Sequence, residues 1–310
     1  MKMSLLLTAA LAVIATPALA QEPGHHPAAA APAGDHGHHH ADFQSGRFHV
    51  RVDGTEGAPD IILIPGLSSS PEVWDALTAE LSGRYRIHRI HVQGFAGAPA
   101  EDNATGPVAA PVAEDIARYI AEKGLDRPAV IGHSMGGTIA MMLAARHPDS
   151  VGRLMVVDMV PFVGAMFGAQ TVEAAAPVAA AVYAQQTRGP EEAYRAAATA
   201  GVTGMIATED RRAGPLEDAA TSDRMVSAAS FRELVETDLR PELGRITVPV
   251  MVLYVTQRAA GLDAAATDAV YQASFSSLPS AKLKRIDDSA HFIMLDQPAR
   301  FAAEVNAFLE

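Results

Sequence analysis

The chain has 310 residues, a formal net charge of −12 at pH 7 and no cysteine. The acidic balance disfavours a nucleic-acid partner and gives no electrostatic attraction to an anionic membrane surface. The lack of cysteine excludes a thiol nucleophile, a thiolate metal site and disulfides, so the fold must depend on its hydrophobic core.

Residues 1–20 have the pattern of a secretory signal peptide. Lys2 gives a positive start, and Leu5–Ala15 is an apolar stretch that is too short to span a bilayer. The small residues of Ala18–Ala20 predict cleavage after Ala20. The sequence therefore predicts a periplasmic or secreted protein with no stable membrane anchor.

Residues 21–45 are expected to form a disordered linker, because alanine, proline and histidine dominate and such a segment cannot build a core. Clustered imidazoles can bind zinc, copper or nickel weakly. We favour a solvated tether, because the tract has no fixed ligand geometry, and keep metal capture as the alternative. The histidines of this segment are His25, His26, His36, His38, His39 and His40.

From residue 46 onward, short apolar runs alternate with helical patterns. A wholly apolar run such as Ile61–Ile64 is typical of a strand that is buried on both faces. The alternation predicts an α/β fold with three layers, in which helices cover both faces of a mostly parallel sheet. Strands are expected at 47–53, 61–64, 86–92, 128–132, 153–157, 249–255 and 282–286, and helices at 111–123, 135–147 and 298–309.

Residues 161–245 contain no convincing strand and are rich in alanine, with methionine, glutamate and arginine at helical spacing. They are expected to form a helical cap inserted over the carboxyl edge of the sheet, where insertions line the ligand crevice. At least half of four methionines in and beside this segment are expected to belong to a core: Met159, Met166, Met205 and Met225.

Ser134 is the candidate nucleophile. It lies in the pattern G-x-S-x-G, formed by Gly132–Gly136, at the end of an expected strand and directly before an expected helix. A serine on so tight a turn needs small residues two positions away on either side, and both are glycine. The adjacent His133 is expected to pack beside the site, because neighbouring side chains diverge at such a turn.

Several segments in this order and spacing resemble the α/β-hydrolase superfamily across residues 46–310. The resemblance implies the fold, a helical cap, and hydrolysis of an ester or related bond by a serine nucleophile. It also implies an oxyanion hole made of two backbone N–H groups, those of Leu67 and Met135. The matching segments are Ile64–Leu67, Gly132–Gly136, Val248–Val250, Ala290–Phe292 and Asp296–Pro298.

His291 is the candidate base. It follows the expected last strand and precedes the expected final helix. An imidazole with a pKa near 6.5 can take the proton of a serine and return it to a leaving group.

The acid of the triad is less clearly marked. In most relatives it follows the strand that corresponds to 249–255, but here Gln257 stands where a carboxylate is expected. Two candidates preserve the order serine, acid, histidine. We prefer Asp158, which directly follows the buried strand 153–157 and would need a strong partner there. Asp263 is the alternative, although it could serve as a helix cap.

The resemblance thus implies a serine hydrolase that cleaves a small, largely apolar carboxylic ester or related acyl substrate through an acyl-enzyme. No cofactor and no metal are expected. One alternative is a carbon–carbon bond hydrolase with the same residues, and another is a small-molecule-binding member of the fold with weak catalysis. Relatives with dehalogenase or epoxide-hydrolase activity carry a carboxylate in place of Ser134, which disfavours those reactions.

Overall fold

The computed structural model describes residues 43–310, so the predicted signal peptide (1–20) and all but the end of the predicted linker (21–45) lie outside the described residues. The described chain forms a seven-stranded sheet with the order β1-β3-β2-β4-β5-β6-β7. β1 is antiparallel to β3, and the other pairs are parallel. The strands are β1 (Phe48–Gly54), β2 (Asp60–Ile64), β3 (Arg86–Val92), β4 (Ala129–His133), β5 (Arg153–Val157), β6 (Val250–Tyr254) and β7 (Lys282–Arg285).

The seven predicted strands are confirmed to within one residue at each end. The reason is visible in β2, where Ile61, Ile62, Leu63 and Ile64 are all fully buried. Ile62 and Ile64 pack in the core on one face of the sheet, whereas Ile61 and Leu63 pack in the core on the other. Because successive side chains of a strand point to opposite faces, a strand covered on both faces must be apolar throughout.

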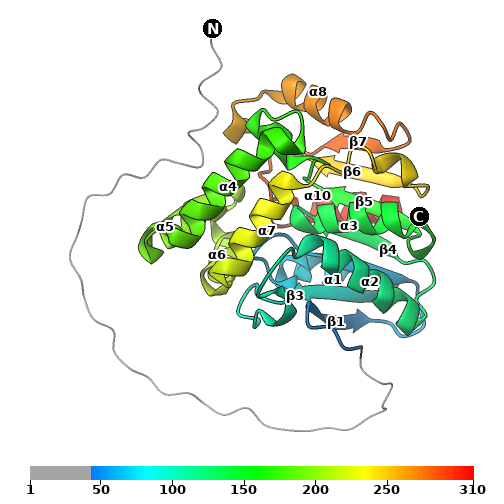
Figure 1. Ribbon diagram of the computed structural model, residues 1–310. Coiled ribbons are helices and arrows are strands. Elements are labelled where there is room, and N and C mark those ends of the chain that lie inside the picture. The colour runs from blue at the N-terminus through cyan, green and yellow to red at the C-terminus, as the bar shows by residue number, and fades with distance from the viewer. Residues whose placement is uncertain (1–42) are drawn as a thin grey trace.

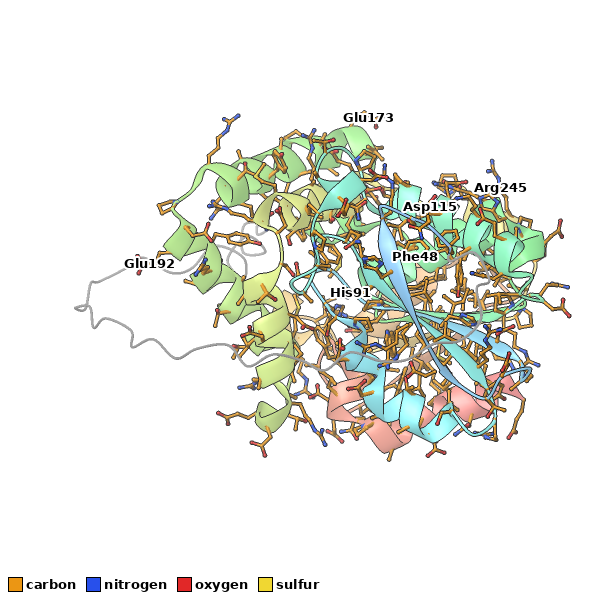
Figure 2. All side chains as sticks on the ribbon, turned by 90° about the horizontal axis from the view of Figure 1, so that it is seen from below. Phe48, His91, Asp115, Glu173, Glu192 and Arg245 are labelled. Carbon is orange, nitrogen blue, oxygen red and sulfur yellow. The ribbon has the colours of Figure 1, made fainter. Side chains whose placement is uncertain are left out.

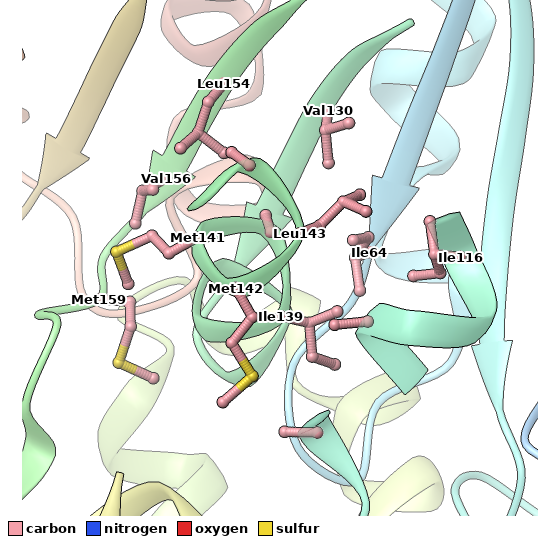
Figure 3. Packing of buried hydrophobic residues seen from close by; sticks show 14 of the residues in the cluster. Ile64, Ile116, Val130, Ile139, Met141, Met142, Leu143, Leu154, Val156 and Met159 are labelled. Carbon is pink, nitrogen blue, oxygen red and sulfur yellow. The ribbon is translucent and has the colours of Figure 1, made fainter. Parts of the chain in front are cut away.

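Helices cover both faces of the sheet and give the predicted three layers (Figure 1). α2 and α3 contribute to the core on one face, and α1 and α10 to the core on the other. Figure 3 shows α3 packed against the sheet, with Met141 beside Val156 and Ile139 beside Ile64 in one buried cluster. The helices are α1 (Asp75–Leu81), α2 (Ala109–Lys123), α3 (Met135–Arg146), α4 (Val172–Arg188), α5 (Glu191–Met205), α6 (Ala213–Thr221), α7 (Arg224–Glu236), α8 (Ala264–Ser274), α9 (Ile293–Asp296) and α10 (Pro298–Leu309).

The predicted helical insertion is present as α4–α7, between β5 and β6. These helices stand together at the left of the sheet in Figure 1. Glu173 and Glu192, on α4 and α5, lie at the outer margin of this group in Figure 2 and are exposed. No helix within residues 43–310 is long and apolar enough to cross a bilayer.

The expectation that at least half of four methionines belong to a core is wrong. Met159 is buried, but Met166, Met205 and Met225 are 43%, 44% and 46% exposed. The insertion is too thin to enclose a large core of its own, and α5 has no buried residue. A helical pattern in the sequence therefore did not reveal which of these side chains would be covered.

Candidate active site

Ser134 occupies a sharp turn between β4 and α3. Its backbone has φ 52° and ψ −122°, a region that side-chain-bearing residues rarely adopt and that costs about 1–3 kcal/mol. Neighbouring backbone hydrogen bonds hold it there. The Ser134 N–H donates to the Val157 carbonyl at 3.0 Å, and the Ser134 carbonyl accepts from the Gly137 N–H at 2.7 Å. The turn is therefore built into the junction of strand, neighbouring strand and helix.

The glycines of the turn are required by close approach of backbone segments. A Cβ on Gly132 would overlap the carbonyl oxygen of Gly136, and a Cβ on Gly136 would overlap the carbonyl oxygen of Ile64. Neither glycine has a positive φ. Their role is therefore to let α3 begin against the ends of β2 and β4, and conformational freedom is not the reason.

His291 and Asp158 are joined by a short hydrogen bond. His291 Nδ1 lies 2.6 Å from Asp158 Oδ2. The Asp158 side chain is 1% exposed and that of His291 is 23% exposed. A carboxylate accepts this bond from Nδ1–H, which leaves a lone pair on His291 Nε2. The pair thus combines a buried, oriented carboxylate with an imidazole that is partly exposed to solvent.

The other oxygen of Asp158 is also satisfied. Oδ1 accepts hydrogen bonds from the Val255 N–H at 3.1 Å, from Gln257 Nε2 at 3.2 Å and from the Tyr271 hydroxyl at 2.9 Å. Burial and the nearby Asp158 charge raise the pKa of Tyr271 well above its usual value, so Tyr271 stays a hydroxyl donor. These donors offset the cost of burying a carboxylate.

Gln257 and Asp263, which lie near the position where most relatives carry the acid, make other contacts. Gln257, which stands where a carboxylate was expected, donates its amide N–H to Asp158 Oδ1. Asp263 caps α8, where it accepts from the Ala266 N–H at 2.8 Å, as its sequence position suggested. Sequence reasoning missed Tyr271 altogether, because a tyrosine within a helix carries no local signal of a contact with Asp158.

His133 packs beside His291, as expected. Its Nε2 lies 3.1 Å from the His291 carbonyl oxygen, to which it donates. The ring centroids of His133 and His291 are 4.6 Å apart, and Phe292 lies at the same distance from His133. Burial lowers the pKa of His133 well below its usual value, and the charge of His291 acts in the same direction. His133 is therefore a neutral support for the loop that carries His291.

The contacts above bring Ser134, His291 and Asp158 to one edge of the sheet. Ser134 is next to His133, which holds the His291 backbone, and Ser134 also pairs with Val157, next to Asp158. Within residues 43–310 the Ser134 hydroxyl makes no hydrogen bond, and His291 Nδ1 is bound to Asp158.

The two expected oxyanion donors, the backbone N–H groups of Leu67 and Met135, belong to segments that lie beside Ser134. A Cβ on Gly66 would lie 3.2 Å from the Ser134 Cβ, so the loop that carries Leu67 passes directly beside the serine. The Met135 N–H is the first of α3 and has no acceptor within that helix. The Leu67 N–H has no acceptor within the described chain. Both amides are therefore free to donate to a ligand.

Metal binding has no candidate among the described side chains. No group of three or more His, Asp or Glu side chains within residues 43–310 is placed to hold a metal ion. The histidine-rich tract lies outside the described residues.

Comparison with known proteins identifies the family. A model of the Alpha/beta hydrolase family matches residues 61–304. The chain belongs to the alpha/beta hydrolase family. A pimeloyl-acyl-carrier protein methyl ester esterase of Aromatoleum aromaticum is 30% identical over 251 residues, which make up 77% of this chain and 94% of the relative. Such relatives support an ester-cleaving serine hydrolase.

Solved structures agree with this alpha/beta hydrolase fold. The enol-lactonase from Burkholderia xenovorans LB400 has a TM-score of 0.68 at 22% identity, and the match covers 84% of this chain and 96% of the lactonase. An esterase from Exiguobacterium antarcticum has a TM-score of 0.70 at 17% identity, with 84% and 94% covered. At these identities the likeness concerns the fold.

Proposed function

We propose that this alpha/beta hydrolase cleaves a small, largely apolar carboxylic ester or related acyl substrate through an acyl-enzyme on Ser134. The observation that carries the proposal is the 2.6 Å hydrogen bond between His291 Nδ1 and Asp158 Oδ2, formed beside the strained turn at Ser134. A buried acid that fixes an imidazole tautomer next to a serine is the arrangement that nucleophilic acyl transfer needs.

The proposed reaction has two halves. In the first, Ser134 Oγ attacks the ester carbonyl carbon while His291 Nε2 takes the hydroxyl proton, and the carbonyl electron pair moves onto oxygen. The tetrahedral intermediate re-forms the carbonyl and expels the alcohol, which takes the proton from Nε2. In the second half, water repeats the attack on the acyl-enzyme, and the acid and free Ser134 are released.

The negative charge of each tetrahedral intermediate falls on the former carbonyl oxygen. We assign its stabilisation to the N–H groups of Leu67 and Met135, which have no acceptor within the described chain. One such donor is worth about 2.7–4 kcal/mol. Both donors belong to the backbone, so their loss can be tested only through the residues that hold them.

We assign the acid role to Asp158 at the end of β5. The support is its contact with His291, its burial, and three further donors on Oδ1 that hold the carboxylate in place. The imidazolium that forms during attack lies against this charge and is stabilised by it. Gln257, at the position where most relatives carry the acid, supports the carboxylate as a donor.

The type of bond that is cleaved is inferred from the relatives. Their names describe a methyl ester esterase, an enol-lactonase and an esterase, all of which act on an ester or lactone bond. Carbon–carbon bond hydrolysis by the same residues and ligand binding without turnover are the competing outcomes. Export to the periplasm or medium is proposed from residues 1–20 alone.

A serine-directed fluorophosphonate and a series of 4-nitrophenyl esters test the function. We expect prompt labelling of the wild type, no labelling of Ser134→Ala, and faster turnover of short-chain acyl esters than of charged ones. Labelling without ester turnover would favour carbon–carbon bond hydrolysis, and neither labelling nor turnover would favour a binding protein. For export, mass spectrometry of protein from the producing cells should find an N-terminus at residue 21; an intact residue 1 would refute it.

A further inference from the structure

The loop that carries Leu67 is held by side chains of the cap. Asp218, on α6, accepts two hydrogen bonds through Oδ2: one from the Ser70 N–H at 2.9 Å and one from the Ser70 hydroxyl at 2.7 Å. Ser227, on α7, has its hydroxyl 2.8 Å from that of Ser68. Two residues that closely follow Leu67 are thus tied to two cap helices.

The hydrogen bonds inside this loop are longer than those to the cap. The Ser69 N–H donates to the Gly66 carbonyl at 3.3 Å, and the Ser69 hydroxyl donates to the Leu67 carbonyl at 3.3 Å. Ser68 has φ 52°, a conformation that a serine does not adopt without support. The shorter bonds to Asp218 and Ser227 supply support from outside the loop.

The cap helices are fixed to the rest of the domain by other contacts. Ser222 Oγ accepts from the Ala96 N–H at 2.8 Å, and the Asp223 N–H donates to the Gly94 carbonyl at 2.7 Å. The carboxylate of Glu233, on α7, accepts from three amides at the start of α2. These contacts set the position of α6 and α7 independently of the loop that carries Leu67, so Asp218 can hold Ser70 in place.

We propose that Asp218 is a positioning residue of the hydrolytic site: by holding Ser70 it sets the direction of the Leu67 N–H, so the oxyanion hole is complete only while α6 is seated on this loop. This inference rests on the proposed function, in which Leu67 and Met135 donate to the oxyanion. The Met135 N–H is fixed by α3 and does not depend on the cap. Displacement of the cap thus weakens one donor of the two.

Asp218→Ala tests the proposal in the full-length protein. We expect kcat for a 4-nitrophenyl ester to fall about 10- to 100-fold, which is less than the 10²- to 10³-fold cost of removing an oxyanion donor outright. KM should change less than about threefold, because an interaction made only in the transition state is lost. A trifluoromethyl ketone, whose carbonyl oxygen becomes an oxyanion when Ser134 Oγ adds to it, should bind more weakly by the same factor by which kcat/KM falls.

Two further variants separate positioning from general damage. Asp218→Asn keeps an oxygen that can accept both bonds from Ser70, and it should restore kcat to within about threefold of the wild type. Glu217→Ala removes the exposed carboxylate that precedes Asp218 on α6 and should leave kcat unchanged. Ser70→Ala removes one of the two donors and should lower kcat about 3- to 10-fold, so it serves if Asp218→Ala does not fold.

The outcomes distinguish this inference from the function on which it rests. If the wild type turns over esters and is labelled at Ser134, but Asp218→Ala has the kcat of Glu217→Ala, the positioning role alone is overturned. The same holds if Ser70→Ala leaves kcat unchanged, or if Asp218→Ala raises KM with no change in kcat. If the wild type shows neither turnover nor labelling, the proposed function is overturned, and this inference with it.

Discussion

Replacing Asp158 by asparagine tests the proposed acid, because the surroundings of this side chain decide which way an amide must turn. Oδ1 faces three donors, a backbone N–H, a glutamine amide and a tyrosine hydroxyl, at 2.9 to 3.2 Å. Oδ2 faces one donor, His291 Nδ1, at 2.6 Å. The asparagine can keep its oxygen at only one of these places.

The magnitudes favour one orientation strongly. Turning the amide nitrogen toward the three donors would leave each without an acceptor, at about 1–3 kcal/mol apiece and so about 3–9 kcal/mol in all. Turning it toward His291 affects one contact. The nitrogen therefore faces Nδ1, which must then accept, and the imidazole carries its proton on Nε2. That tautomer cannot take the proton of Ser134, so we expect kcat to fall about 10⁴-fold.

Steady-state turnover of a 4-nitrophenyl ester at pH 8 measures the effect, with circular dichroism to confirm that the variant folds. Asp263→Asn is the matched control, since Asp263 is the alternative acid and asparagine caps a helix as well as aspartate does. We expect this control to retain kcat within about twofold. The reasoning is refuted if Asp158→Asn keeps more than a tenth of wild-type kcat, or if Asp263→Asn is the variant that loses activity.

Three further predictions concern the same site. Tyr271→Phe keeps the ring but removes one of the donors to Asp158 Oδ1, and urea denaturation should show a loss of about 1–2 kcal/mol in the free energy of unfolding; no loss would deny the hydrogen bond. Gly136→Ala overlaps backbone oxygens and should cost more than about 2 kcal/mol, whereas Gly201→Ala, with open space around it, should be neutral or stabilising. The pKa of His133 is lowered by burial, so below pH 6.5 the unfolded chain binds a proton that the folded chain does not. The free energy of unfolding therefore decreases as the pH is lowered. His133→Gln should therefore lose less stability than the wild type between pH 6.5 and 5 in matched denaturation curves, and equal losses would contradict this.

Much of the frame of this protein could be predicted from its sequence. Ile61–Ile64 predicted a buried strand because a strand covered on both faces must be apolar throughout. Gly132 and Gly136 marked the turn at Ser134 because no side chain fits where backbone segments meet. Both signals lie in short stretches of chain, so the local sequence contains all the information needed.

The partners of these local features depend on the tertiary structure. Tyr271 reaches Asp158 from α8, and Asp218 reaches Ser70 from the cap, although each pair is far apart in the chain. No local sequence pattern identifies Tyr271 or Asp218 as the residue that makes the contact. Met205 and Met225 are likewise exposed, although the helical pattern of the cap did not distinguish them from buried residues.

Periodicity and steric exclusion act between near neighbours, so the order of residues was enough to predict the strands and the tight turn at Ser134. It left Asp158 and Asp263 as alternative partners for His291. The packed domain shows that Asp158, with Gln257 as a donor, is the one that faces His291. That choice depends on β5 and β6 being adjacent in the sheet, so that the residues after both strands share one edge. Adjacency of strands is a property of the packed domain, and no single segment of the chain contains it.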